Sequence, residues 1–312
     1  MQDAEARSLG RIARLRAGND VLDSFLSTPR VVIAAAVALL MILTAVLAPL
    51  IAPHDPFDMA AISLLDSELP PAFLEGGDAR FLLGTDSQGR DVFSAILHGL
   101  RISLMVGVVA VLLSMALGVT VGLVSGYFGG FVDSVLMRLA DVILSFPTIL
   151  IALLVNGILR GVLPSTQATA TAVLVLVLSI AVNEWVQYAR TVRGSTMVEK
   201  GKEYVKAARL TGLPPRTILR RHVLPNILSP VLVLATINLA LAILTEATLS
   251  FLGVGMPPTQ PSLGTLINTG NEFLFSGIWW VVVFPALTLV VLVLSVNIVG
   301  DWLRDALNPH LR

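Results

Sequence analysis

Long, nearly uncharged apolar runs constrain this chain more than any other feature of its sequence. Hydrophobic residues make up 55% of its 312 residues and charged residues only 13%, about half the charged share of a typical soluble domain. A helix needs about 20 mostly apolar residues to cross the hydrocarbon core of a bilayer. Six segments meet this requirement, at residues 31–51, 102–126, 135–159, 168–186, 227–252 and 278–301. The sequence therefore predicts an all-α integral membrane protein with six transmembrane helices.

The first apolar run follows a basic tail, as the core of a signal peptide does. The run at 31–52 is longer than the signal-peptide core of about 7–15 residues, and no small-residue cleavage pattern closes it. We therefore predict a retained first transmembrane helix at 31–52, after a tail at 1–30. A long acidic loop follows at 53–100, then a core of five helices at 101–302 and a C-terminal tail at 303–312.

Lysine and arginine are distributed unevenly among the predicted loops. The N-terminal tail carries five arginines, and the loop between the fourth and fifth spans carries nine basic residues. These nine are Arg190, Arg193, Lys200, Lys202, Lys206, Arg209, Arg216, Arg220 and Arg221. Cytoplasmic loops carry an excess of lysine and arginine. Both termini and the loop at 190–226 are therefore predicted to lie in the cytoplasm.

This chain lacks the residues that several classes of chemistry require. It has no cysteine, which excludes disulfides, thiolate metal sites and a cysteine nucleophile. Its four histidines form no H-E-x-x-H pattern, and neither a G-x-S-x-G elbow nor a G-x-x-x-x-G-K-[ST] phosphate loop is present. We predict no catalytic residue, no metal site, no cofactor bound by this chain and no nucleic-acid partner; an intramembrane enzyme is disfavoured.

Two short patterns carry structural predictions. Gly118, Gly122 and Gly126 repeat every four residues in the second span, which is typical of a close helix-packing surface. The stretch at 85–90 superficially resembles a calcium loop, but Leu97 stands where the final glutamate is required. We interpret residues 85–87 as a turn with helix-capping side chains.

Polar side chains inside the spans are candidates for a gate or for the solute path, because such groups are costly in a bilayer. The candidates are Arg138, Asp141, Glu184, Asn238 and Glu246. The i, i+3 spacing of Arg138 and Asp141 predicts an ion pair, more structural than gating. Asn238 favours an interhelical hydrogen bond. For Glu246, a place in the path and a packing role stay equally open.

The stretch at 203–225, here called the knob, has glycine and proline at positions that predict two short helices. Gly212 predicts the end of the first helix, since glycine readily takes a positive φ. Pro215 can open a second short helix and Pro225 is predicted to end it. Ala207 and Ala208 would allow a partner's backbone to approach closely. The alternative is a basic surface loop that touches anionic lipid.

The knob resembles the cytoplasmic EAA loop of binding-protein-dependent ABC importer permeases. The positions that match that loop are Ala207, Ala208, Gly212, Leu224 and Pro225. Lys206 stands where the loop usually has glutamate, and Glu203 lies one turn earlier, on a neighbouring face. The resemblance extends to residues 83–92, 145–147, 246–253 and 301–309, which are similar to the dipeptide/oligopeptide permease group. The long acidic loop suggests the second type of permease in such systems.

This resemblance implies a type I ABC importer permease-like bundle in the bacterial cytoplasmic (inner) membrane. It implies a non-catalytic subunit that forms half of the translocation pathway and couples to an ATPase through the knob. Its partners would be a sister permease in a heterodimer, two cytoplasmic ABC ATPase subunits that use ATP and Mg, and an extracytoplasmic solute-binding protein. A dipeptide or oligopeptide is the favoured solute; glutathione, nickel or other metal chelates, or another small solute are alternatives. The rival class is a secondary transporter, which would leave the knob unexplained.

Overall fold

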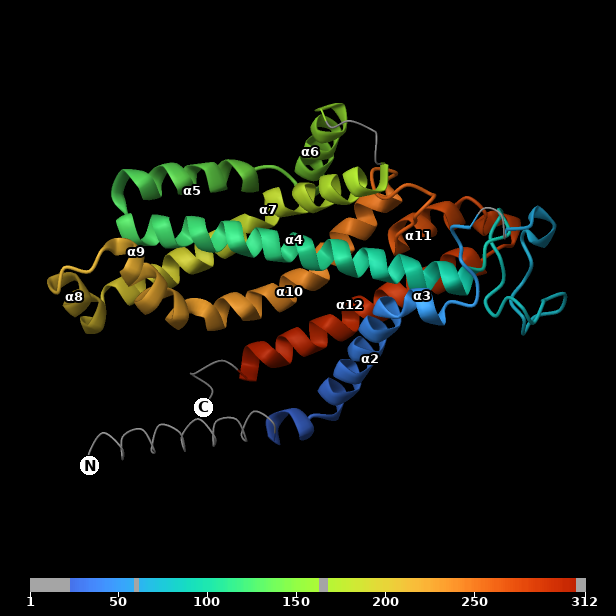
Figure 1. Ribbon diagram of the computed structural model, residues 1–312, viewed down its shortest axis with the longest axis horizontal. Helices are drawn as coiled ribbons and strands as arrows, with labels where there is room; N and C mark the ends of the chain where they lie inside the picture. The colour runs from blue at the N-terminus through green and yellow to red at the C-terminus, as the bar shows by residue number, and fades with distance from the viewer. Residues whose placement is uncertain (1–22, 59–61, 163–167, 307–312) are drawn as a thin grey trace.

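Helices make up the body of the protein (Figure 1). The computed structural model describes residues 23–58, 62–162 and 168–306. Its four longest helices run alongside one another: α4 (Val92–Phe128), α7 (Ala168–Lys200), α10 (Leu224–Phe251) and α12 (Trp280–Ala306). In the described part of the chain, the only β-type pairing is one isolated bridge between Thr85 and Asp91. The predicted all-α class is confirmed.

Five of the described helical stretches are long and apolar enough to cross a membrane. They are α2 (Pro29–Val46), α4, α7, α12 and the continuous stretch that ends with α10, Pro215–Phe251. A sixth span is formed if α5 (Gly130–Leu144) and α6 (Thr148–Val162) are counted together. Shorter elements connect them: α3 (Ala48–Ile51), η1 (Leu64–Asp66), α8 (Glu203–Leu210), α9 (Pro215–Ile218), η3 (Leu219–Val223), α11 (Leu263–Asn271) and η4 (Leu274–Ser276).

The third predicted span, 135–159, differs in shape from the expected single helix. α5 and α6 meet at 97° across residues 145–147, and Figure 1 shows α6 turning away from the bundle while α5 runs beside it. Pro147 explains the break. A proline disfavours the helical region for the residue before it, here Phe146, and cannot donate a hydrogen bond to the carbonyl of Ile143.

Several helices extend beyond the apolar runs from which they were predicted, so their boundaries differ from the predicted ones. α4 begins ten residues before its predicted span, since Asp91 caps it by accepting hydrogen bonds from Phe93 N and Ser94 N. The long acidic loop therefore ends at Asp91 and not at residue 100. α7 continues to Lys200, so the first part of the loop predicted at 190–226 is helical. α12 reaches Ala306, and residues 307–312 lie outside the described part.

The glycine stripe of α4 is a close packing surface against α7, as predicted. A Cβ atom added to Gly118, Gly122 or Gly126 would lie only 2.4, 2.5 or 2.8 Å, respectively, from a backbone carbonyl oxygen of α7. These contacts are shorter than any that a real Cβ atom makes, and a backbone cannot move aside as a flexible side chain can. The stripe fixes the register of the two helices.

Replacing Gly122 with valine is therefore expected to destabilise the helix pair strongly. Overpacking against a rigid neighbour costs about 1–3 kcal/mol, and here the neighbour is the carbonyl of Ala189. The variant should show a lower melting temperature in detergent and a lower yield of folded protein. Gly194→Val is the matched control, because no heavy atom lies within 4 Å of a Cβ added there. Equal melting temperatures for the two variants would contradict the packing assignment.

The long acidic loop is fixed to the bundle by buried polar contacts. Trp280 Nε1 donates to the carbonyl oxygen of Thr85 at 3.0 Å. Arg90 forms an ion pair with Asp86 at 2.6 Å and donates to the carbonyl oxygen of Pro258 at 2.9 Å. The predicted turn at 85–87 is confirmed, because Asp86 accepts from Gln88 N and Arg90 N. The helix cap, however, is Asp91 rather than these residues.

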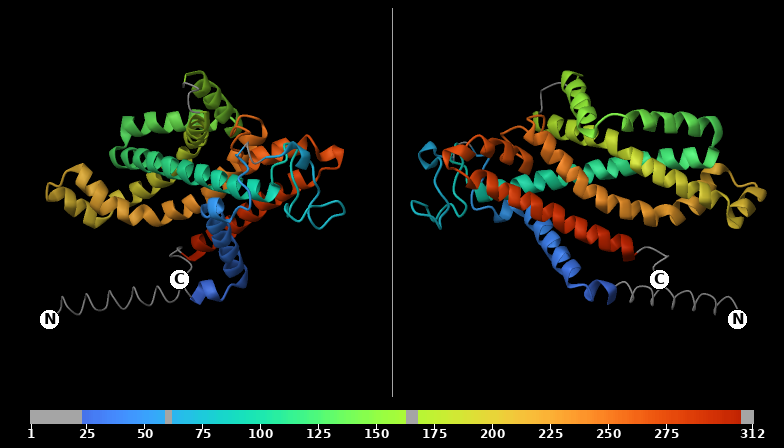
Figure 2. Two further views of the ribbon diagram at one scale, coloured as in Figure 1. Left: turned by 45° about the vertical axis from the view of Figure 1, so that its right-hand side comes forward. Right: turned by 180° about the vertical axis from the view of Figure 1, so that it is seen from behind.

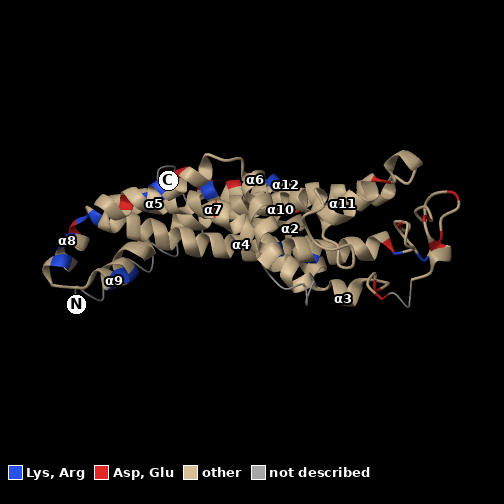
Figure 3. Ribbon diagram, turned by 90° about the horizontal axis from the view of Figure 1, so that it is seen from above, with Lys and Arg blue, Asp and Glu red and all other residues tan. Residues whose placement is uncertain are grey.

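Charge separates toward the two ends of the bundle. Figure 3 shows lysine and arginine gathered around α8 and α9 at one end, and aspartate and glutamate gathered in the loop after α3 at the other. The start of α2 and the end of α12 point toward the knob end, as the views in Figure 2 show. Four of the five predicted tail arginines, at 7, 11, 14 and 16, lie outside the described residues.

Candidate functional site

The first helix of the knob ends where the sequence predicted. Gly212, two residues after α8, takes a φ of +74°. Its N–H donates to the carbonyl oxygen of Arg209 at 3.0 Å, and the N–H of Leu213 donates to that of Ala208 at 3.2 Å. This pair of bonds is the common helix cap that requires a left-handed residue. Gly212 is therefore confirmed as the point where the chain turns back.

The second half of the knob differs from the predicted short helix that ends at Pro225. α9 continues through the π-helical segment η3 into α10, and Pro225 lies in the first turn of α10. In a regular α-helix a proline ring clashes with the carbonyl four residues before it. The wider π-helical turn directly ahead of Pro225 gives that ring room, so the helix does not stop. The knob and α10 form one continuous helical unit.

Ala208 faces the interior of the knob and not a partner. Its side chain is 7% exposed and packs with Val205 in an apolar cluster. The other buried members come from α7, η3 and neighbouring elements: Tyr127, Tyr188, Val192, Ile218, Val223, Ile227 and Val231. The predicted partner contact at Ala208 does not hold, because α8 turns this residue inward. The cluster instead joins the knob to α7 and α10.

The outward face of α8 carries small and apolar side chains. Ala207 is exposed, and Leu210 is 89% exposed. Glu203, also exposed, lies in the first turn of α8, where a carboxylate is favoured by the helix dipole. At the base of the knob, Leu224 is half-buried and Pro225 is exposed. An apolar tip on a protruding basic element is typical of a protein contact.

A polar network fixes the angle between α7 and α8. The hydroxyl of Tyr204 donates to Glu199 at the end of α7, and Lys202 forms an ion pair with the same carboxylate at 2.5 Å. Asn226 Nδ2 donates to the Tyr204 hydroxyl at 3.0 Å from the first turn of α10. Burial of the hydroxyl and its bond to Glu199 raise the pKa of Tyr204 to about 12. Tyr204 thus links three helices by one neutral hydroxyl.

Tyr204→Phe removes that hydroxyl and is expected to loosen the knob. A hydrogen bond of this kind contributes about 1 kcal/mol, so backbone amides of α8 should exchange with deuterium about fivefold faster. The measurement is hydrogen exchange of the purified full chain. Tyr127→Phe is the control, because within the described residues the Tyr127 hydroxyl makes no hydrogen bond while its ring and carbonyl do the binding. Unchanged exchange in Tyr204→Phe would mean that the Tyr204 hydroxyl does not stabilise the knob.

The ion pair predicted between Arg138 and Asp141 is not the one that forms. Asp141 instead accepts from Arg190 of α7 at 2.6 Å. α5 lies along α7, and this packing places the Arg190 guanidinium opposite Asp141, which spacing within one helix cannot reveal. Arg138 is exposed. The pair is about half-exposed on both sides, so it ties α5 to α7 at the surface of this subunit.

Glu184 and Asn238 are brought together with Tyr188 between α7 and α10. All three side chains are buried, at 7%, 1% and 0% exposure, respectively. Among the described residues, none makes a hydrogen bond of standard geometry with Glu184 Oε2, with the Tyr188 hydroxyl or with either Asn238 amide atom. The Asn238 amide nevertheless lies against the Tyr188 hydroxyl of the facing helix, so the partner for the interhelical contact predicted at Asn238 is in place.

Glu246 has a packing role at the opposite end of α10. The side chain is fully buried and accepts hydrogen bonds from Ser103 of α4 at 2.7 Å and from Ser250 at 2.6 Å. Ser103 Oγ also accepts from Leu263 N, and Ser262 donates to Ser250. The carboxyl group therefore joins α4, α10 and the start of α11. These contacts give Glu246 a packing role within this chain.

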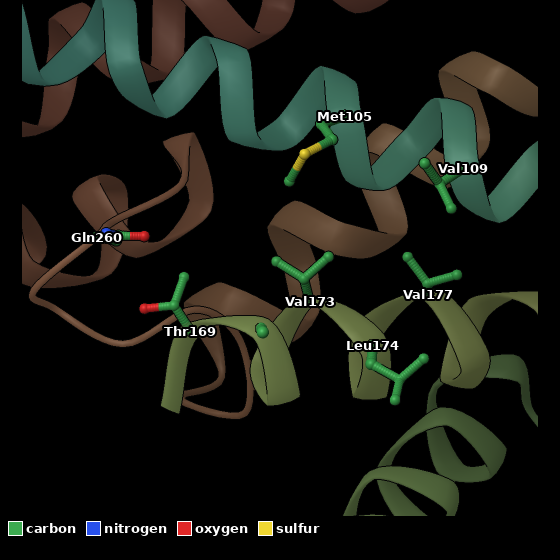
Figure 4. Close-up of a pocket in the computed structure, with 8 residues that line it drawn as sticks. Met105, Val109, Thr169, Val173, Leu174, Val177 and Gln260 are labelled. Atoms are coloured by element: carbon green, nitrogen blue, oxygen red, sulfur yellow. The ribbon is translucent and has the colours of Figure 1, made fainter. Parts of the chain in front are cut away.

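An apolar cavity of about 520 Å³ lies between α4, α7 and the loop after α10 (Figure 4). Met105 and Val109 project into it from α4, Val173 and Val177 from α7, and Gln260 from the loop. None of the five predicted gate or path residues lines it. The predicted path residues are thus spread over three separate places and do not converge on one polar site.

Contacts between distant segments were missed by sequence reasoning. Asn156 and Arg160 of α6 donate to the carbonyl oxygens of Val254 and Gly255. Asp133 of α5 receives two hydrogen bonds from Arg193 of α7. Neither contact has a local spacing that predicts it, because both partners lie many residues apart. Within the described ranges, no group of three or more His, Asp or Glu side chains is arranged to hold a metal ion.

Comparison with known proteins places this arrangement in a family. The model of the family described as binding-protein-dependent transport system inner membrane component matches residues 118–312. A second model, the N-terminal TM domain of oligopeptide transport permease C, matches residues 18–71. The chain belongs to the binding-protein-dependent transport system inner membrane component family, and it is a permease subunit of an ABC importer.

Individual relatives of this chain are peptide or glutathione permeases. The chain is 42% identical to the dipeptide transport system permease protein DppC of Haemophilus influenzae, over 88% of each chain. It is 39% identical to the di/tripeptide transport system permease protein DppC of Pseudomonas aeruginosa, over 88% of this chain and 86% of that one. It is also 39% identical to the glutathione transport system permease protein GsiD of Pectobacterium atrosepticum, over 76% and 75%.

A solved structure shares the fold. The inward-facing MetNI methionine ABC transporter contains a chain that superposes with a TM-score of 0.53 at 20% identity. The superposition covers 69% of this chain and 96% of that one. The likeness confirms a type I ABC importer permease fold.

Proposed function

We propose that this permease imports dipeptides or short oligopeptides in a heterodimer with a sister permease. Two cytoplasmic ATPase subunits would dock on the knobs, and an extracytoplasmic solute-binding protein would deliver the peptide. The observation that carries the proposal is the knob itself: an exposed apolar tip whose core is continuous with α7 and α10. The names of the relatives support the peptide class.

The geometry supports a mechanical role for this chain. Movement of an ATPase against Ala207 and Leu210 would be passed through the knob's apolar cluster to α7 and α10. α7 carries the motion to α4 through the glycine stripe. The helices α4, α7 and α10 would therefore move together, while ATP binding and hydrolysis take place in the partner.

The orientation follows from the charge distribution. The knob end, rich in lysine and arginine, would face the cytoplasm and the acidic outer loop would face outward. Because the chain has no cysteine, single cysteines report each side without background. Arg216→Cys, at an exposed knob position, should react with a membrane-impermeant thiol reagent only after cells are opened, and Phe73→Cys should react in intact cells whose outer barrier is permeabilised. The reverse pattern would contradict the orientation.

Peptide import is tested by uptake in proteoliposomes that contain this chain, its sister permease, the ATPases and the binding protein. ATP is supplied in the compartment that the knob faces. Labelled dipeptide should accumulate in that compartment only when ATP is present there. Glutathione is the second candidate, favoured by the resemblance to the glutathione permease. ATP-dependent uptake of glutathione without uptake of dipeptide would replace the peptide assignment. Uptake driven by an ion gradient without ATP would overturn the importer role.

A further inference from the structure

A basic cavity of about 400 Å³ lies between the α4–α5 turn and the flank of the knob. Three cationic side chains line it: Lys200 at the end of α7, and Lys206 and Arg209 on α8. Asp133 is the one carboxylate in the lining. This flank differs from the outward face of α8, which carries Ala207 and Leu210.

The carboxylate of Asp133 is already neutralised. Arg193 donates to both of its oxygens, from Nε at 2.5 Å and from Nη2 at 2.6 Å, and the hydroxyl of Ser125 donates to it as well. A bidentate arginine pair satisfies a carboxylate in charge and in geometry. The three cations of the lining are therefore left without an internal counterion from Asp133.

Two of the three cations, Lys200 and Arg209, are held in place by Tyr127 at the end of α4. Its ring lies 4.8 Å from Arg209 Cζ and 5.7 Å from Lys200 Nζ, and its carbonyl oxygen accepts a hydrogen bond from Lys200. Cation–π contacts of this kind fix a guanidinium without cancelling its charge. Lys206 is exposed, and no carboxylate in the described part of the chain forms an ion pair with it. The cavity is thus a preformed positive site.

Exposed apolar side chains lie next to the lining residues: Met197 is one of them, and Phe128 and Phe131 are within two positions of the lining residue Gly129 in the chain. Phe131 is 83% exposed, Phe128 55% and Met197 52%, and they continue the apolar surfaces of the membrane helices α4, α5 and α7. Cations beside such a surface match the head and the chains of an anionic lipid. A soluble anion would use the cations and leave these apolar side chains uncovered.

We propose that this cavity binds the phosphate headgroup of an anionic membrane lipid, such as phosphatidylglycerol. The bound phosphate contacts Lys206 and Arg209 from the knob and Lys200 from α7, while the acyl chains lie along Phe128 and Phe131. The lipid thereby bridges the knob and the bilayer. This inference goes beyond the transport role, and it stands or falls without regard to which solute is imported or which ATPase docks.

The test measures lipid binding to the purified full chain in zwitterionic detergent by native mass spectrometry, with phosphatidylglycerol and phosphatidylcholine as probes. Each cation near a membrane surface contributes about fivefold to binding of an anionic lipid, so Lys206→Gln should weaken phosphatidylglycerol binding about fivefold and Lys206→Gln/Arg209→Gln roughly 30-fold. The matched control is Arg216→Gln/Arg220→Gln, which removes the same charge from exposed knob positions outside the cavity. The control should bind as the wild type does.

Each other outcome overturns the proposal. Equal loss in the control double variant would mean that binding follows total charge. Equal retention of phosphatidylcholine and phosphatidylglycerol would mean that the headgroup charge is not recognised. Displacement of the lipid by inorganic phosphate at low millimolar concentration would reassign the cavity to a soluble anion. Because Arg209 also packs on Tyr127, the single variant at the exposed Lys206 decides the result if the double variant melts at a lower temperature.

Discussion

A Gly212→Val permease is expected to insert into the membrane normally and to lose most of its ATP-driven uptake. Gly212 has a φ of +74°, where a β-branched side chain is strongly disfavoured. No heavy atom lies within 4 Å of an added Cβ, so the cost comes from the backbone and not from crowding. A left-handed conformation costs about 1–2 kcal/mol for an ordinary residue, which corresponds to a loss of uptake of about 5- to 30-fold if the native turn is required.

Because the expected loss at Gly212 comes from the backbone conformation, a residue that tolerates this conformation serves as the control. Asparagine tolerates the left-handed region and often replaces glycine at this position of a helix cap. Gly212→Asn should therefore keep uptake near the wild-type level, although its side chain is as large as that of valine. Uptake and membrane content would be measured side by side for both variants. Full ATP-driven uptake by the valine variant would count heavily against coupling through the knob.

Ala207→Trp is expected to release the ATPase subunits from an otherwise folded permease. Ala207 lies on the outward face of α8 beside Leu210, and an indole there would hold a docked partner away from the helix. Loss of one well-packed contact of this kind costs about 2 kcal/mol or more, and so at least about 30-fold in affinity. The measurement is the amount of ATPase that co-purifies with the variant.

The neighbouring residue separates docking from folding. Ala208 is buried in the knob's apolar cluster, so Ala208→Trp should overpack that cluster and lower the melting temperature of the chain itself. Ala207→Trp should leave the melting temperature unchanged, and Ala207→Ser should retain the ATPase. Undiminished co-purification with Ala207→Trp would mean that the partner does not contact this face.

Sequence patterns predicted the local features of this protein well. The apolar runs located the membrane helices, the glycine spacing marked the packing face of α4 without naming its partner, and Gly212 marked the end of α8. Each of these features depends on neighbours within one or two turns, which composition and spacing can report. The same reasoning placed a continuous helix across Pro147, where the structure has a bend of 97°.

Features that depend on packing between distant segments were not accessible in this way. Asp141 has a basic residue one turn before it in its own helix, yet it pairs with Arg190, 49 positions away. The direction in which Ala208 points was set by the cluster around Tyr188 and Ile227, which forms only when the ends of α7 and α10 come together. The positive cavity beside the knob likewise requires the bidentate pairing of Asp133 with Arg193.

The central claim, that this permease couples to a separate ATPase through its knob, is tested most directly by gentle affinity purification from native membranes. The account predicts that a sister permease and ATPases with phosphate-binding loops accompany the wild-type chain, that the complex hydrolyses ATP, and that hydrolysis rises when peptide-loaded binding protein is added. Ala207→Trp should remove the ATPases and that activity. A chain that purifies alone and moves solute on an ion gradient without ATP would contradict the account.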